Sequence, residues 1–194
     1  MIVRTRDAVA VIGSVAALFA VIVAFILLNP RLVQPREPAI GIETGQYAPS
    51  FTIRDVNMTE WDLAAHRGEV VLLDFMGVYC GPCMQEMRDG SMQSLYETYT
   101  SQGFTILSID VGGISGTENP IEAWRFVRGL NSDGTQRWDP GNWPIALDNQ
   151  GLVTTFGVGP IPMKYLLDRS GKIVWNHVGY ATPTEFRDQI LPIL

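Results

Sequence analysis

The sequence contains little cysteine: Cys80 and Cys83 are the only two among its 194 residues. Two cysteines cannot build a framework of several disulfides, and they are too few for a four-cysteine zinc site. A c-type haem attachment would need histidine directly after the second cysteine, where this chain has Met84. A structural staple is a weak interpretation, because a bridge across two intervening residues closes a very short loop and restrains little of the unfolded chain. These exclusions favour a reactive pair.

Basic residues are also scarce. The chain has 14 Lys and Arg against 20 Asp and Glu, which gives a formal net charge of −6. No run of five or six basic residues occurs, so the sequence offers no electrostatic support for nucleic-acid binding. We find no internal repeat and no low-complexity tract.

One long uncharged segment lies near the N-terminus, at residues 8–28. A helix of this length spans roughly 31 Å, which matches the hydrocarbon core of a bilayer. We therefore expect a transmembrane anchor, preceded by a tail of residues 1–7. A cleavable signal peptide would have a shorter apolar core and end in small residues, whereas this run ends in Leu27 and Leu28; an uncleaved anchor is favoured over cleavage.

The orientation of this anchor is weakly encoded, because arginines lie on both sides of it and the positive-inside rule barely discriminates. An N-terminal anchor with a very short leading tail usually leaves that tail inside the cell. We expect a single-pass membrane protein whose main domain, residues 45–194, is extracytoplasmic and follows a proline-rich linker of residues 29–44.

The main domain alternates between strand and helix patterns. Residues 69–75 form an apolar, β-branched run typical of a central buried strand, and residues 104–111 read as the next one. A helix is expected from Cys83 to about Thr100, although Gly90 weakens its middle. The other expected elements are strands at 50–55, 56–63, 143–148, 163–168 and 173–180, helices at 119–130 and 182–191, and a short helix or turn at 151–158. This order predicts an α/β fold, with a mixed central sheet flanked by helices.

The cysteine pair follows the end of the central strand and begins the next helix. Unpaired N–H groups and the positive end of the helix dipole stabilise an anion there, which lowers the pKa of the first cysteine. We expect Cys80 to be the nucleophile and Cys83, one turn later and more buried, to attack a mixed disulfide. Pro82 suits the first turn, where its missing N–H costs nothing.

The segment DFMGVYCGPC, residues 74–83, resembles the active-site segment of thioredoxin, and the tetrapeptide Cys80-Gly81-Pro82-Cys83 matches its motif in full. Together with APSF (48–51), RGEVVLLDF (67–75) and GVGPIPMKYLLDRSGKIV (157–174), it makes residues 45–194 similar to the membrane-anchored thioredoxin-like proteins of the TlpA and ResA group.

This resemblance implies a thioredoxin-like fold and a thiol-disulfide oxidoreductase that needs no cofactor and no metal. Its partners would be proteins with thiols or disulfides, and a membrane electron donor would recharge it. The shared Gly-Pro pair favours reduction of clients, since thioredoxin itself is a reductant of about −270 mV.

The resemblance also implies roles for single residues. Pro162 matches the cis-proline opposite the cysteines, and Ile161 before it would offer its backbone to an extended substrate. Asp74 matches the buried acid of thioredoxin, whose raised pKa suits a base that deprotonates Cys83. Glu86 matches a glutamate that ResA-like members place near the cysteines, although acids in the first turns of a helix are also favoured on a solvated face.

The chain departs from the family pattern at three places. Met76 and Tyr79 stand where thioredoxins commonly carry tryptophans, so the apolar rim of the site is softer. Arg88 stands where the TlpA-like pattern often has proline, which leaves the subfamily open. An insertion around residues 112–143 is rich in Gly, Asn and Asp, so we expect exposed loops that influence the choice of partner.

Two other functions stay open at this point. A peroxiredoxin-like peroxidase shares the APSF opening, but that family has a threonine three residues before its reactive cysteine, where this chain has Gly77. An SCO-like copper-delivery protein uses a wider cysteine spacing and a distant histidine, for which His177 is conceivable. Peroxide consumption, copper binding and reduction of a protein disulfide separate the three.

Overall fold

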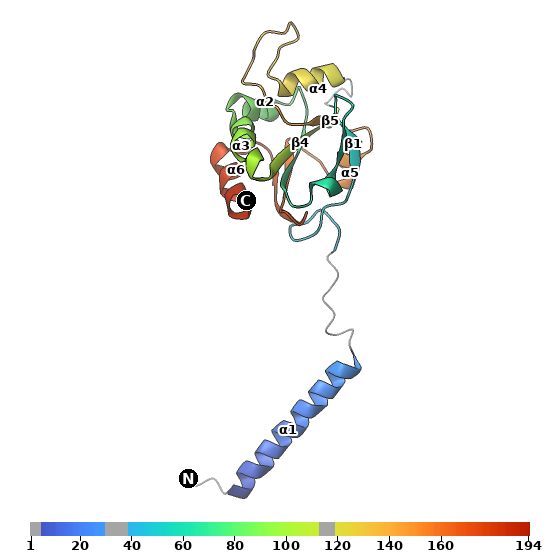
Figure 1. Cartoon of the computed structure of the whole chain (residues 1–194), viewed down its shortest axis with the longest axis vertical. Coiled ribbons are helices and arrows are strands. Elements are labelled where there is room, and N and C mark those ends of the chain that lie inside the picture. The colour runs from blue at the N-terminus through green and yellow to red at the C-terminus, as the bar shows by residue number, and fades with distance from the viewer. Residues whose placement is uncertain (1–4, 30–38, 113–118) are drawn as a thin grey trace. The chain divides into compact units, whose positions relative to one another are not determined.

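The computed structural model describes residues 5–29, 39–112 and 119–194, and it divides into two units, Met1–Pro38 and Ala39–Leu194 (Figure 1). Much of the expected linker and the first part of the insertion, at residues 30–38 and 113–118, therefore lie outside the described residues.

The first unit contains helix α1 (Thr5–Leu28). Asn29 closes this helix, since its backbone N–H and its side-chain amide donate to the carbonyl oxygen of Phe25 at 3.1 Å and 2.8 Å. From Val15 to Leu28 the large apolar side chains of the helix are exposed. None of the helices within the described ranges has both the length and the hydropathy that a bilayer span requires.

The second unit is built on a five-stranded sheet in the order β5-β4-β3-β6-β7. The central strand β3 pairs in parallel with β4 and antiparallel with β6, so the sheet is mixed, as the sequence predicts. Every residue of β3 and β4 is buried. The strands are β3 (Val70–Met76), β4 (Phe104–Asp110), β5 (Ile145–Leu147), β6 (Met163–Leu167) and β7 (Ile173–Val178), and a separate pair is formed by β1 (Thr52–Arg54) and β2 (Glu60–Asp62).

Both faces of the sheet are covered. Because side chains alternate along a strand, Leu72 belongs to one buried cluster and Leu73 to the other. The first cluster packs against α2 (Gly81–Arg88), α3 (Ser91–Tyr99), α4 (Pro120–Val127) and α6 (Pro183–Ile190). The second packs against β1, β2 and α5 (Leu152–Thr155), and Figure 1 shows α3 and α6 on the side opposite β1 and α5. Short 3₁₀ helices lie at Leu63–His66, Thr100–Gln102 and Leu191–Ile193.

The expectation of one continuous helix after the cysteines is wrong. The segment folds as two helices, α2 and α3, which meet at Gly90. Gly90 has a left-handed backbone (φ 66°), which a residue with a side chain rarely adopts. Asp89 is the C-cap of α2, and its carboxylate accepts the N–H of Ser91, the first residue of α3, at 3.0 Å. The active-site helix is therefore only eight residues long.

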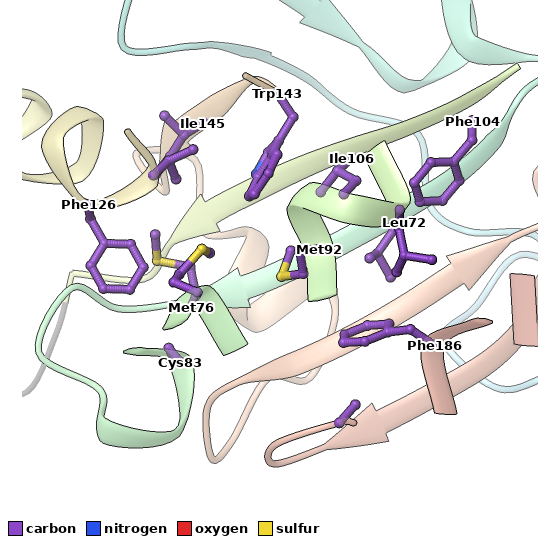
Figure 2. Packing of buried hydrophobic residues seen from close by; sticks show 14 of the residues in the cluster. Leu72, Met76, Cys83, Met92, Phe104, Ile106, Phe126, Trp143, Ile145 and Phe186 are labelled. Carbon is purple, nitrogen blue, oxygen red and sulfur yellow. The ribbon is translucent and has the colours of Figure 1, made fainter. Parts of the chain in front are cut away.

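The insertion is less exposed than its composition predicts. It contributes α4, which begins at Asn119, whose side chain accepts the N–H groups of the first turn. It also contributes Trp138 and Trp143, which are 6% and 1% exposed. The expectation of exposed loops holds for residues 132–137. Figure 2 shows Trp143 in the cluster on the helix-covered face, which also contains Cys83.

Candidate active site

The two cysteines form a disulfide where β3 leads into α2, with their Cα atoms 5.2 Å apart. Cys80 is the N-cap of the helix, and its sulfur accepts the backbone N–H of Cys83 at 3.2 Å. Cys83 is 1% exposed, whereas Cys80 is half-buried and Gly81 and Pro82 are exposed. The geometry therefore gives solvent access to the outer sulfur and places a helix N-terminus against it.

The rim around Cys80 brings distant parts of the chain together. The Sγ atom of Cys80 lies 3.7 Å from the carbonyl oxygen of Ile161. The peptide bond between Ile161 and Pro162 is cis, as the resemblance implies, and Pro162 is buried. Tyr79, directly before the disulfide, is 60% exposed. These residues form an accessible surface beside the outer sulfur.

A shallow cleft adjoins this rim. The active-site loop supplies Val78 and Tyr79 to its wall, and the insertion supplies the rest. Two arginines and one glutamate give the insertion side a mixed charge. The lining residues from the insertion are Glu122, Arg125, Phe126, Leu130, Asn131, Ser132 and Arg137.

Asp74 lies in β3 and is 1% exposed. Its Oδ2 atom accepts a hydrogen bond of 2.9 Å from the hydroxyl of Ser108, which in turn accepts one of 2.9 Å from the indole N–H of Trp143. Its Oδ1 atom has no hydrogen-bond partner among the described residues. Burial raises the pKa of Asp74 above its ordinary value, and this effect exceeds the opposing effects of Lys164 and Ser108.

Glu86 is also buried, at 1% exposed, so the alternative of a solvated helix acid is wrong. Its Oε1 atom lies 2.6 Å from the Nζ atom of Lys164 and accepts the backbone N–H of Ala181 at 2.7 Å. Burial is the largest cause that raises the pKa of Glu86 to about 7. Lys164 lowers this pKa, and the neighbouring Asp74 raises it.

Lys164 is the residue that the sequence interpretation missed. Its side chain is fully buried, and it lies directly opposite Asp74 in the pairing of β6 with β3. The available signal was a lysine inside an otherwise apolar strand, two residues after Pro162. This signal does not reveal the partner, because strand register and the position of Glu86 are set by tertiary packing.

The side chain of His177 contacts residues of β7 and of the loop that follows it. Its ring stacks on Trp175, with centroids 5.3 Å apart, and its Nε2 atom lies 3.1 Å from the carbonyl oxygen of Tyr180. Nearby, the Tyr180 hydroxyl donates to Asp89 at 2.6 Å, which links the loop after β7 to the end of α2. Arg88, one residue earlier, is exposed.

Comparison with known proteins finds relatives that are named as thiol-disulfide oxidoreductases. The model of the AhpC/TSA family matches residues 44–176. The thiol-disulfide oxidoreductase ResA of Bacillus thuringiensis (strain Al Hakam) is 31% identical over 153 residues, which cover 78% of this chain and 79% of that protein. ResA of Geobacillus thermodenitrificans is 31% identical over 151 residues, with 77% and 78% covered.

Solved structures agree with these relatives. A putative thiol:disulfide interchange protein DsbE from Chlorobium tepidum superimposes with a TM-score of 0.62 at 26% identity, covering 79% of this chain and 99% of that one. The pneumococcal exposed lipoprotein thioredoxin Etrx1 of Streptococcus pneumoniae shares the fold, with a TM-score of 0.59 at 20% identity, covering 74% of this chain and 99% of that one.

The raised pKa of Glu86 makes stability depend on pH. Between its ordinary value of 4.5 and about 7, the folded protein holds a proton that the unfolded chain releases. The stability contributed by Glu86 is therefore fully present below pH 4.5 and is lost as the pH rises through about 7. Thermal unfolding of the wild type and Glu86→Gln across this range should show the wild type losing stability relative to the variant. A difference in Tm that stays constant with pH would contradict this assignment.

Proposed function

The chain belongs to the AhpC/TSA family and is a thioredoxin-like thiol-disulfide oxidoreductase of the ResA and DsbE type. From this premise we propose that it reduces disulfides of extracytoplasmic client proteins through the Cys80 and Cys83 dithiol. The observation that carries the proposal is the disulfide at the N-terminus of α2, with one sulfur accessible and the other buried.

In the proposed cycle, the thiolate of Cys80 attacks a client disulfide and forms a mixed disulfide with one client sulfur. Cys83 then attacks Cys80, which releases the client as a dithiol and leaves the enzyme oxidised. Asp74 acts as the base that takes the proton of Cys83. Its burial on the same side of the sheet as Cys83 supports this role, because burial raises its pKa toward the working range of a base.

Client binding is proposed for the rim of the site. An extended client segment would pair with the backbone of Ile161, while Pro162, which lacks an N–H, would pack against the disulfide. The contact between Cys80 and the carbonyl of Ile161 supports this placement. Tyr79 and the cleft beside it would contact the residues that flank the client cysteine, so the insertion would take part in selecting clients.

We further propose that residues 8–28 tether the domain to a membrane, with the domain on the extracytoplasmic side. The uncharged run of the sequence and the exposed apolar side chains between Val15 and Leu28 support this tether. Such a reductant must be recharged after each cycle, so a membrane electron donor is proposed as its second partner.

Cell fractionation tests the tether. The full chain should remain in the membrane pellet after an alkaline wash, which removes peripheral proteins, whereas a chain lacking residues 1–28 should be soluble. A pelleted truncation or a washable full chain would contradict the proposal.

Trapping tests the roles of the cysteines. Cys83→Ala should accumulate mixed disulfides through Cys80, because the step that releases the client is blocked. These adducts should appear on non-reducing gels, disappear with reductant and be absent from Cys80→Ala. If Cys83→Ala traps no protein, the proposed cycle is wrong.

A kinetic comparison tests Asp74. Asp74→Ala should slow the resolution of a mixed disulfide by Cys83 by about 10²-fold or more, the contribution typical of a general base. First attack by Cys80 should change much less. Glu97→Ala, which removes an exposed acid of α3, should affect neither step. Equal slowing of both steps by Asp74→Ala would refute the proposed role.

The open alternatives have their own assays. A peroxidase would consume peroxide in the presence of a reductant, and a copper-delivery protein would retain copper stoichiometrically after mild loading. Reduction of an insulin-like disulfide without either activity is the result expected of an oxidoreductase.

A further inference from the structure

A row of polar side chains crosses the sheet beneath α2. Ser108 of β4, Asp74 of β3 and Lys164 of β6 are successive register partners, and all three are buried. Their neighbours two positions away on the strands, Leu72 and Leu166 among them, belong to the buried cluster that contains Cys83. The row therefore faces the helix that carries the disulfide.

Glu86 of α2 contacts this row of polar side chains from the helix side of the sheet. It lies one turn after Cys83 in α2, and residues three apart on a helix share a face. Both side chains are 1% exposed. The carboxylate of Glu86 lies 2.6 Å from the ammonium of Lys164, so α2 and β6 are joined by a buried ion pair on the helix face that also carries Cys83.

Lys164 is surrounded by more negative charge than it can balance. Its Nζ atom donates to Glu86 and to the carbonyl oxygen of Gly179 at 3.0 Å, and it lies 5.7 Å from the ring of Phe186. It also interacts electrostatically with Asp74. One ammonium thus faces two carboxylates in a buried layer.

Two buried carboxylates beside one ammonium cannot both be ionised without an uncompensated buried charge. The favourable state keeps one proton, shared between the two acids, and the pair titrates as a unit. Further ionisable groups border the layer, and one of them is Asp110, which is buried two positions after Ser108 on β4. His177 is the register partner of Lys164 on β7, and Tyr180 is hydrogen-bonded to Asp89 at the end of α2.

We propose that Lys164 is a positioning residue of the redox site, which holds Asp74 and Glu86 as a two-carboxylate unit that takes up and returns the proton of Cys83. This proposal rests on the proposed roles of Cys80 and Cys83. With the ammonium present, one carboxylate is available as a base near neutral pH. Without it, both acids hold their protons to a higher pH, so less of the base form is available to Cys83 at neutral pH.

The proton and electron balance is complete. In resolution, the S–H bond of Cys83 breaks, its proton moves to the carboxylate unit, and the sulfur bonds to Cys80 as the bond from Cys80 to the client sulfur breaks. The client receives two electrons and the dithiol loses two. In recharge, a thiolate of a donor dithiol attacks Cys80 as the bond between Cys80 and Cys83 breaks, Cys83 leaves as a thiolate, and the unit returns the proton to it. The second thiol of the donor then attacks the donor sulfur bound to Cys80, which releases Cys80 as a thiolate and leaves the donor as a disulfide.

The test follows the two steps separately by stopped flow. The reduced full-length protein reacts with a nitroaryl disulfide, whose released thiolate is coloured. The first, concentration-dependent phase reports attack by Cys80, and the second, concentration-independent phase reports resolution by Cys83. Both phases are recorded from pH 5 to pH 9.

Lys164→Met removes the charge and keeps an unbranched chain of similar length. Its resolution phase should titrate at a pH higher by about one unit or more and be about tenfold slower at pH 7, since one pKa unit corresponds to a tenfold change. The first phase should change much less. Lys172→Met is the matched control, since Lys172 is the only other lysine of the sequence and contacts the ring of Tyr47; its profile should equal that of the wild type.

Glu86→Gln provides the opposite test. It retains an acceptor for Lys164 and Ala181 but removes the repulsion between the two acids, so the resolution phase should titrate at a lower pH than in the wild type. A merely structural ion pair predicts no such opposite shifts.

Unchanged profiles, or shifts in the same direction, would overturn the proposal. If Lys164→Met does not fold, the downward shift in Glu86→Gln decides alone, and its absence overturns the proposal. If the wild type shows no second phase, the proposed redox cycle fails instead.

Discussion

The buried ion pair between Lys164 and Glu86 is the constraint on which the site depends. A buried ammonium is tolerated only where its partners are fixed, because removal of one member of the pair leaves an uncompensated charge in the buried layer. Here the ion pair and its hydrogen-bond partners come from three parts of the fold, α2, β6 and the loop before α6. The helix that carries the disulfide is therefore held against the sheet by charge as well as by apolar packing.

This attachment explains how a helix of eight residues keeps a fixed position. Gly90 separates α2 from α3, so the shorter helix does not inherit the stability of a long one. Its N-terminus is tied to the strand end through Cys80, and its C-terminal half is tied to the sheet through Glu86 and to the loop after β7 through Asp89. The N–H groups that face Cys80 owe their position to these contacts.

Local sequence signals were sufficient for much of this architecture. The order of apolar strand runs and helix patterns predicts the mixed sheet and its helices, and the resemblance implies the cis bond before Pro162. The burial of Cys83 and Asp74 follows from their places on a helix face and a central strand. The expectation of a single helix after the cysteines is wrong, because the left-handed backbone of Gly90 ends the first helix rather than only weakening a long one.

What local signals could not supply was the set of partners. Glu86 reads as a surface acid until Lys164 is known to lie beside it, and Lys164 reads only as a lysine within an apolar strand until the register of β6 with β3 is known. One further consequence concerns chemical labelling. Acylating reagents reach amines only when these are exposed, so the half-buried Lys172 is the more accessible of the two lysines, while Lys164 is fully buried. The rate of Lys164 acylation, followed by mass spectrometry, would therefore report how often local unfolding exposes this buried side chain.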